Sequence, residues 1–200
     1  MITTYSDDYL YSVDIDTINN VELVDQCLKI EYNLLKNLGS ISDPGWYGNV
    51  PSAHNDKYNL LTYANREFSI LYREMIKHIS PFLEQDECYV LKSWLNVYRV
   101  GESVKWHGHW KIGQRVWHGF YCAQVGDSST YYKIPGVDGV ITVPSKEGRL
   151  VFGRSEGDQH RSSDWEDTTK PRITLAFDIV PIESVSGMYP NHFIPFHVKY

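Results

Sequence analysis

Residues 98–109 read YRVGESVKWHGH and hold two histidines close together. His107 and His109 are two residues apart, so in an extended strand both imidazoles point to the same face. Gly108 between them lets another segment approach the backbone closely. A third histidine, His160, follows a glycine-containing turn and could reach the pair from a distant strand. Because imidazole binds iron, copper, nickel and zinc, the three histidines predict a clamp on one metal ion.

The other five histidines fit ordinary structural roles better. His118 lies within an apolar run, where we expect it to pack or to line a cavity rather than to bind metal. The remaining four lie in stretches that read as helix, loop or tail, and we expect them to be structural or exposed. They are His54, His78, His192 and His197.

The composition favours a single β-rich domain. A chain of 200 residues suits one domain and is long enough to bury a core. Aromatic residues make up 14% of it, including 15 Tyr and 6 Trp, and such residues suit pleated surfaces. The net charge is −6 and no basic run occurs. Binding to a nucleic-acid backbone is therefore disfavoured as the main activity.

Cysteine spacing and hydropathy indicate the compartment. The three cysteines are far apart, so they predict neither a zinc knuckle nor a disulfide framework, and reduced thiols are typical of the cytosol. The first 16 residues are acidic and lack the pattern of a signal peptide. No stretch approaches the roughly 18 apolar residues that a membrane span needs. We therefore expect a cytoplasmic protein without membrane contact.

Two helices are predicted in the first half of the chain, at about residues 17–38 and 60–80, the second ended by Pro81. Residues 40–57 between them predict a loop, since they are rich in Gly, Pro, Ser and Asn. The predicted buried stripe of the first helix is Val21, Val24, Leu28, Tyr32 and Leu35, widened by Cys27, Leu34 and Leu38.

Short β-type runs make up the rest of the chain. They lie at residues 9–14, 88–100, 118–125, 139–144, 148–153 and 172–181. Several short strands after two helices predict an α+β fold that is mainly β, a jelly-roll or cupin-like barrel with a helical support. We expect one domain over residues 1–200. Its parts are an N-terminal strand with supporting helices (1–85), a β core (86–182) and a tail (183–200).

A second candidate site lies on the run 172–181. Arg172 and Thr174 share one face of this strand, and apolar side chains take the other. A buried arginine needs an anion, and its planar fork binds a carboxylate in two places while a threonine hydroxyl adds one more bond. The alternative is an arginine that is exposed at the strand's start or paired with Asp158, Asp164 or Glu166.

Together these residues resemble the Fe(II)- and 2-oxoglutarate-dependent oxygenases, in particular the prolyl-4-hydroxylase-like group and the oxygenase-like proteins common in tailed-phage genomes. The similarity covers roughly half of the chain, from about residue 94 to 181. It rests on the order of Tyr98-x-x-Gly101, the histidine pair, the strand at 118–121, the run GRLVF at 148–152, His160 and Arg172-x-Thr174. It implies a double-stranded β-helix buttressed by the two N-terminal helices.

The resemblance also implies roles for single residues. His107, His109 and His160 would form the catalytic metal centre and bind Fe(II). Arg172 and Thr174 would bind the distal carboxylate of 2-oxoglutarate. The implied reaction consumes O2 and 2-oxoglutarate, hydroxylates a substrate and releases succinate and CO2. The remaining residues implied at the cosubstrate cavity are Tyr98, Asn96 and Tyr121.

The chain departs from this family at His109, where the usual motif has Asp or Glu. Either His109 is a ligand, which gives a neutral three-histidine site, or it points away and leaves two histidines completed by water, an anion or another acid. A neutral ligand set donates less electron density to iron. The departure therefore bears on activity more than on fold.

Two other functions stay open. Residues 101–114 and 157–160 also resemble the two cupin motifs, with Gln114 where cupins usually have Glu. This allows a three-histidine metalloenzyme that does not use 2-oxoglutarate. The third option is a non-catalytic barrel with an interaction role. The pair Arg172-x-Thr174 favours the oxygenase, because cupins have no need of it.

The sequence leaves the substrate undetermined. The acidic charge favours a protein side chain or a metabolite over nucleic acid. Loops 40–57 and 126–140 are candidates for the substrate rim. The oligomeric state is open, with a homodimer among the options, and the compartment would be the host cytoplasm if the protein is phage-encoded.

Overall fold

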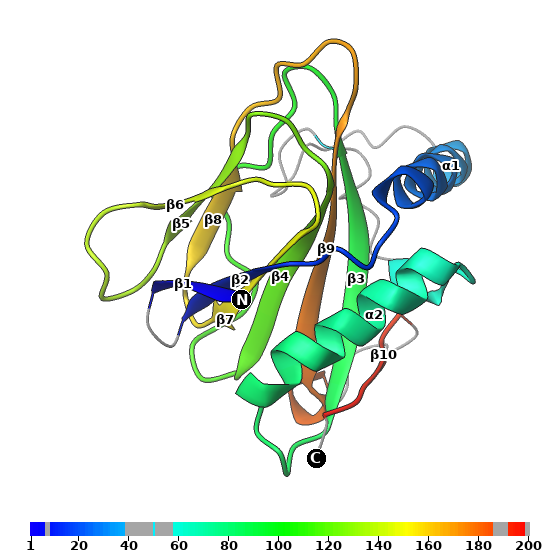
Figure 1. Ribbon diagram of the computed structural model, residues 1–200. Coiled ribbons are helices and arrows are strands. Elements are labelled where there is room, and N and C mark those ends of the chain that lie inside the picture. Colours follow the sequence, from blue (N-terminus) through cyan, green and yellow to red (C-terminus); the bar gives the residue numbers. More distant parts are fainter. Residues whose placement is uncertain (7–8, 39–49, 51–57, 186–191, 199–200) are drawn as a thin grey trace.

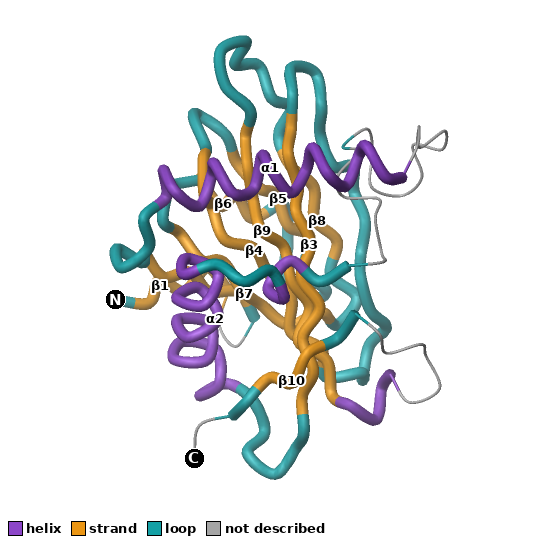
Figure 2. Tube along the Cα trace, turned by 90° about the vertical axis from the view of Figure 1, so that its right-hand side faces the viewer, coloured by secondary structure: helices purple, strands orange, loops and turns teal. Residues whose placement is uncertain are grey.

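The computed structural model describes residues 1–6, 9–38, 50, 58–185 and 192–198, and in these residues two antiparallel β-sheets face each other (Figure 1). The larger sheet has the strand order β1-β2-β7-β4-β9-β3-β10, and the smaller sheet has the order β6-β5-β8. The two helices lie on the outer face of the larger sheet (Figures 1 and 2). The predicted fold, a mainly β barrel of the double-stranded β-helix type with two supporting helices, is confirmed.

The strands of the larger sheet are β1 (Ile2–Ser6), β2 (Leu10–Asp14), β3 (Tyr89–Tyr98), β4 (Val116–Gln124), β7 (Arg149–Ser155), β9 (Arg172–Pro181) and β10 (Ile194–Phe196). Those of the smaller sheet are β5 (Ser129–Lys133), β6 (Ile141–Pro144) and β8 (Gln159–Ser162). The helices are α1 (Asn20–Leu38) and α2 (Arg66–Ile79), with 3-10 turns η2 (Leu60–Thr62), η3 (Ser80–Phe82) and η4 (Ile182–Val185). No helix among the described residues is long and apolar enough to span a membrane.

The buried face of α1 differs from the predicted stripe. Val21 and Tyr32 are 82% and 67% exposed, so the prediction was wrong for both. Apolar residues on this helix form two neighbouring rows, each with helical spacing, and periodicity alone could not choose between them. Packing on the sheet selects the row made of Leu23, Cys27, Ile30 and Leu34.

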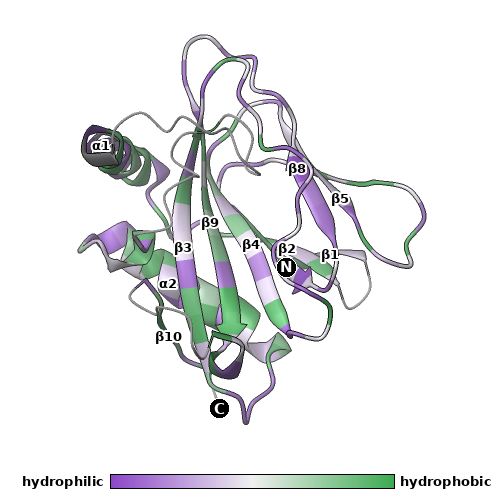
Figure 3. Ribbon diagram, turned by 180° about the vertical axis from the view of Figure 1, so that it is seen from behind, coloured by the Kyte–Doolittle hydropathy of each residue, from purple (hydrophilic) through white to green (hydrophobic). Residues whose placement is uncertain are grey.

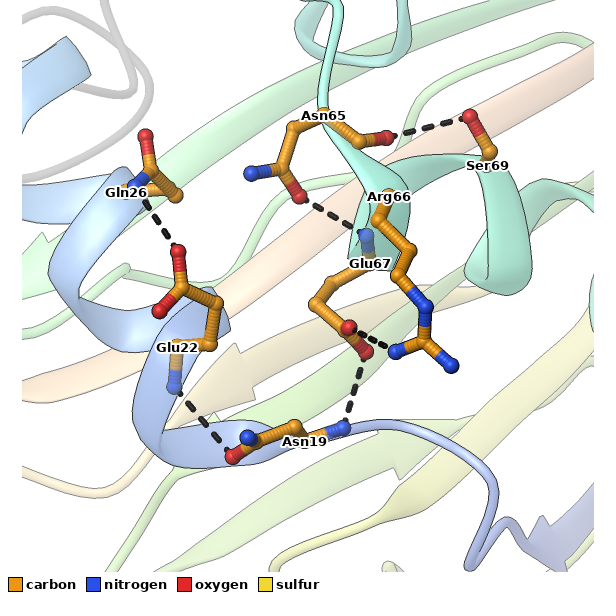
Figure 4. A network of polar contacts seen from close by, with 7 residues as sticks. All are labelled: Asn19, Glu22, Gln26, Asn65, Arg66, Glu67 and Ser69. Atoms are coloured by element: carbon orange, nitrogen blue, oxygen red, sulfur yellow. Dashed lines mark hydrogen bonds and ion pairs between the residues drawn. The ribbon is translucent and has the colours of Figure 1, made fainter.

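Polar contacts join the first turns of the two helices (Figure 4). The side chain of Asn65 caps α2 by accepting a hydrogen bond from the backbone N–H of Glu67 at 2.8 Å. The helix therefore begins several residues later than predicted, after the 3-10 turn η2. The buried carboxylate of Glu67 accepts a hydrogen bond from the backbone N–H of Asn19 at 2.8 Å, and so fixes α1 against α2.

The central strands of the larger sheet have two different faces. Figure 3 shows polar segments interrupting the apolar ones along β3, β9 and β4. On β9, Ile173, Leu175 and Phe177 belong to the hydrophobic core, as the alternation predicts. The other face, which begins with Arg172 and Thr174, lines a cavity between the two sheets.

The structure tests only one of the two loops, 40–57 and 126–140, that we predicted to form the substrate rim. Residues 129–133 of the predicted loop 126–140 form β5, the central strand of the smaller sheet, so that prediction was wrong there. The strand was missed because its sequence STYYK has only two tyrosines as apolar residues. The loop 40–57 lies outside the described residues except for Val50, which is buried.

Candidate functional site

Backbone pairing brings the two histidine motifs together. His107 lies in the loop between β3 and β4, not in the regular strand that we predicted, and forms an isolated bridge with His160 of β8. Each N–H donates to the carbonyl of the other residue, at 3.1 and 2.9 Å. A Cβ on Gly108 would lie 2.7 Å from the carbonyl oxygen of Asp158. This close approach therefore requires glycine.

The imidazoles of His107 and His109 point toward each other, with 3.2 Å between their Nε2 atoms. Nδ1 of His107 donates to the carbonyl oxygen of Lys105 at 2.7 Å, and Nδ1 of His109 bonds to Oδ1 of Asp178 at 2.8 Å. With both Nδ1 atoms engaged by oxygens, the two Nε2 atoms face each other, and a bound cation would accept a lone pair from each. Two bonds of about 2.1 Å from one metal ion hold neighbouring nitrogens about 3.0–3.4 Å apart, so the observed spacing fits.

His160 completes a group of three. Its ring centroid lies 4.3 Å from that of His107 and 5.0 Å from that of His109. One nitrogen from each of the three rings falls within 4.8 Å of the others, which makes them a candidate metal site. Burial lowers the pKa of His107 to about 4 and also lowers the pKa of His160. Both are therefore neutral near pH 7, the form that binds a metal ion.

A second group, made of His118, Asp158 and His160, shares one histidine with the first. Nε2 of His118 lies 3.1 Å from Oδ2 of Asp158, and Nδ1 of His160 lies 3.7 Å from the same oxygen. Burial alone would lower the pKa of His118, but the Asp158 carboxylate outweighs it and raises that pKa. His118 and Asp158 thus form a buried ion pair in the cavity wall, where the sequence had placed His118.

Asp178 supports His109 and was missed by the sequence reasoning. Its Oδ1 meets His109, and its Oδ2 accepts from the indole N–H of Trp110 at 3.0 Å. Burial alone would raise the pKa of Asp178, but these contacts lower it, so the group is a carboxylate. The signal was present in the sequence, because residue 178 continues the every-second-residue row that starts with Arg172 and Thr174.

Arg172 is buried, at 1% exposure, and is incompletely paired. Its Nη2 lies 3.3 Å from Oγ1 of Thr130 and 3.5 Å from Oγ of Ser145, while Nε and Nη1 have no hydrogen-bond partner among the described residues. The guanidinium lies over the Tyr98 ring at 4.9 Å. No carboxylate of the described residues pairs with it, so the alternative of an ion pair with Asp158, Asp164 or Glu166 is wrong for the described structure.

One cavity contains both candidate sites. It is partly open to solvent. The predicted residues that line it are His107, His109, His160, Arg172, Thr174, Tyr98 and Asn96. His118, Thr130, Tyr132 and Ser162 add polar groups, and Trp94, Phe120 and Ala176 add apolar walls.

Tyr121 does not lie at this cavity, so its predicted role was wrong. Its hydroxyl donates to Oδ1 of Asn20 at the start of α1, at 2.8 Å. Side chains alternate along β4, and His118 and Phe120 take the cavity face. Tyr121, three residues after His118, must therefore point to the helix side.

No protein-family model matches the chain, and no curated protein matches its sequence. Solved structures match over most of its length. A prolyl hydroxylase from Trichoplax adhaerens, in complex with a hypoxia inducible factor peptide, aligns with a TM-score of 0.63 at 10% identity, covering 91% of this chain and 88% of that one. A Pseudomonas putida prolyl-4-hydroxylase gives 0.61 at 11% identity, covering 88% and 94%. The α-ketoglutarate-dependent carbocyclase SnoK from nogalamycin biosynthesis gives 0.63 at 12% identity, covering 96% and 94%.

The chain has the fold of the 2-oxoglutarate-dependent oxygenases. The sequence resemblance predicted this fold correctly, although identities of 10–12% are too low for sequence comparison alone to find it. Within this oxygenase fold, the histidine group and Arg172 face one cavity between the two sheets. The arrangement can bind a metal ion at the histidines and an anion at Arg172.

Proposed function

We propose that the protein is an Fe(II)- and 2-oxoglutarate-dependent dioxygenase that hydroxylates its substrate and releases succinate and CO2. The observation that carries this proposal is the state of Arg172. A fully buried guanidinium, two of whose nitrogens have no hydrogen-bond partner among the described residues, faces the same cavity as three convergent imidazoles. Burial of such a cation is costly without an anion, and a dicarboxylate that also reaches the metal supplies one.

The three histidines would hold the metal ion through neutral ring nitrogens. The 3.2 Å between the Nε2 atoms of His107 and His109 fits such an ion. In both rings Nδ1 bonds to an oxygen, so Nε2 is the nitrogen that would bind the metal. When bound, Fe(II) with 2-oxoglutarate supplies the activation of O2. The protein keeps the ligand nitrogens in place before the ion binds, which reduces the cost of ordering them.

Arg172 would bind the distal carboxylate of 2-oxoglutarate through Nε and Nη1. Thr174 and Tyr98 line the cavity beside it and can add hydroxyl donors, and Asn96 has a buried Oδ1 without a partner among the described residues. The apolar walls would limit contact between the reacting groups and water. The substrate that we propose is a protein side chain or a small metabolite.

A three-histidine ligand set is also the feature that favours the second candidate, a cupin-type metalloenzyme that does not use 2-oxoglutarate. This candidate accounts for the metal site but not for Arg172. The two functions therefore differ in whether 2-oxoglutarate binds, and in whether that binding depends on the guanidinium.

Anaerobic titration with Fe(II) and then 2-oxoglutarate tests the proposal. The wild type is expected to develop the visible metal-to-ligand charge-transfer band of the chelated cosubstrate. Arg172→Met keeps the volume but removes the cation, and should show no band at concentrations that saturate the wild type. Arg161→Ala is the matched control, because Arg161 stacks on Trp106 and Tyr131 and does not line the cavity.

The results separate the candidates. Loss of the band in Arg172→Met with retention in Arg161→Ala supports the dioxygenase. Iron binding without any band in the wild type contradicts it and favours the cupin-type enzyme. A wild type that binds no metal contradicts both enzymes and leaves the non-catalytic barrel.

A further inference from the structure

Both carboxylate oxygens of Asp178 form hydrogen bonds next to the candidate metal site. Its side chain is 10% exposed, and that of His109 is 9% exposed. One oxygen meets Nδ1 of His109 at 2.8 Å, and the other accepts from Nε1 of Trp110 at 3.0 Å. Both oxygens therefore have defined partners, and neither belongs to the candidate metal groups found among the described residues.

The two ring nitrogens of His109 face different partners. Nδ1 faces Asp178, while Nε2 faces His107 at 3.2 Å on the cavity side. A carboxylate that holds Nδ1–H leaves the Nε2 lone pair for the metal and fixes the direction of the ring. The ring therefore transmits the influence of Asp178 to whatever ion lies at Nε2.

We propose that Asp178 is a positioning residue that acts on the metal through His109 and restores the negative charge that the histidine ligand does not bring. This rests on the proposed function. Three neutral imidazoles and one carboxylate have the same net charge as two imidazoles and a carboxylate ligand. The acid that the family motif usually has beside the metal is thus replaced here by a histidine–aspartate pair.

The contribution of Asp178 is measured by its effect on metal affinity. Loss of such an outer carboxylate typically weakens metal binding about 10- to 100-fold. The probe is Co(II), bound to the full-length protein without cosubstrate, with affinity measured by competition against a chromophoric chelator. Asp178→Asn should weaken binding by that factor and shift the visible ligand-field bands of Co(II), because a neutral amide polarises the imidazole less.

Two further variants show whether the effect passes through His109. Trp110→Phe removes the other hydrogen bond of the same carboxylate and keeps its charge, so Co(II) affinity and the ligand-field bands should stay close to wild type. In a His109→Ala background, Asp178→Asn should no longer change the affinity. An equal loss in both backgrounds, or a Trp110→Phe variant that behaves like Asp178→Asn, would overturn the inference.

A measurement on the wild type covers the case in which Asp178→Asn does not fold. In the Zn(II)-loaded protein, nitrogen-15 NMR of the histidine rings should show His109 bound through Nε2 with a proton on Nδ1. Binding through Nδ1 would overturn the inference. If the wild type binds neither Co(II) nor Zn(II), the proposed function fails and the inference with it, whereas metal binding that ignores Asp178 overturns the inference alone.

Discussion

Among single residues, Gly108 decides how closely the two histidine motifs can approach. Any side chain there would meet the Asp158 carbonyl, because the Cβ position lies 2.7 Å from that oxygen. Gly108→Ala should therefore push the His107 segment away from β8. We expect a loss of about 1–3 kcal/mol in the free energy of unfolding and a large loss of Co(II) affinity.

Gly136→Ala is the control for this prediction. Gly136 has a φ of 79° and no atom within 4 Å of its Cβ position. Its substitution costs about 1–2 kcal/mol of backbone strain without touching the site. Urea unfolding and chelator competition on both variants provide the comparison. Equal Co(II) affinity in Gly108→Ala and wild type would contradict the role given to Gly108.

The buried pair of His118 and Asp158 predicts a pH dependence of stability. The pKa of His118 is raised in the folded protein, so its protonation stabilises the fold below the unfolded-state pKa of about 6.5. That contribution is lost as the pH rises through the higher folded-state pKa. In urea unfolding of the metal-free protein, the advantage of wild type over His118→Gln should be larger at pH 6 than at pH 9. A constant difference would contradict the pairing.

The residues of the site differ in how visible they are in the sequence. The close histidine pair and the arginine within an apolar strand could be found, because each is an unusual residue in its pattern. Asp158 could not be assigned, since its role depends on which ring it contacts after folding. Asp178 could have been placed on the Arg172 face by alternation, but its contact with His109 depends on the fold. Tyr121 was misplaced because the alternation along its strand was not applied to it.

At the level of elements, the two faces of β9 have different roles: one packs in the hydrophobic core and the other lines the cavity. Leu175 belongs to the core at 1% exposure, while Thr174 lines the cavity. Leu175→Ala should lower the free energy of unfolding by about 2–5 kcal/mol. Thr174→Val should lower the free energy of unfolding by less, about 0.5–1.5 kcal/mol, because the buried Asn96 amide loses the hydroxyl oxygen to which it donates at 3.4 Å. It should weaken 2-oxoglutarate binding by a similar amount, the value of one hydrogen bond.

Urea unfolding and cosubstrate titration on the same two proteins measure both quantities. The strand assignment would be contradicted if Thr174→Val destabilised the protein as much as Leu175→Ala, or if it left cosubstrate binding unchanged.

Elements with an apolar pattern could be predicted, and polar ones could not. The runs that became β3, β4, β7 and β9 are apolar enough to be recognised. By contrast, β8 has the sequence QHRS and is defined only by its pairing with β5 and with the His107 segment. Such a strand forms through tertiary contacts, so single-sequence reasoning does not find it.

For the whole molecule, the candidate metal site joins the two sheets. His107 and His109 belong to the loop that follows β3 of the larger sheet, and His160 belongs to β8 of the smaller one. An ion bound by all three binds the folded state and not the unfolded chain. At a free Co(II) concentration of 100 times Kd, we expect a gain of about 2.7 kcal/mol in the free energy of unfolding.

Thermal or urea unfolding with Co(II) and with a chelator measures this gain. His107→Ala should lose it, while His78→Ala should keep it, because His78 lies on α2 beside Glu74 and away from the cavity. An equal gain in both variants would show that Co(II) stabilises the protein elsewhere.

The proposed metal and cosubstrate sites are tested most directly by a crystal structure of the wild type prepared without oxygen in the presence of Fe(II) and 2-oxoglutarate, with the ion located by its anomalous scattering. We expect one ion bound by His107, His109 and His160, and a carboxylate of 2-oxoglutarate on Arg172. An ion held by His118 and Asp158 instead, or a cavity in which Arg172 meets no carboxylate, would contradict the proposed sites.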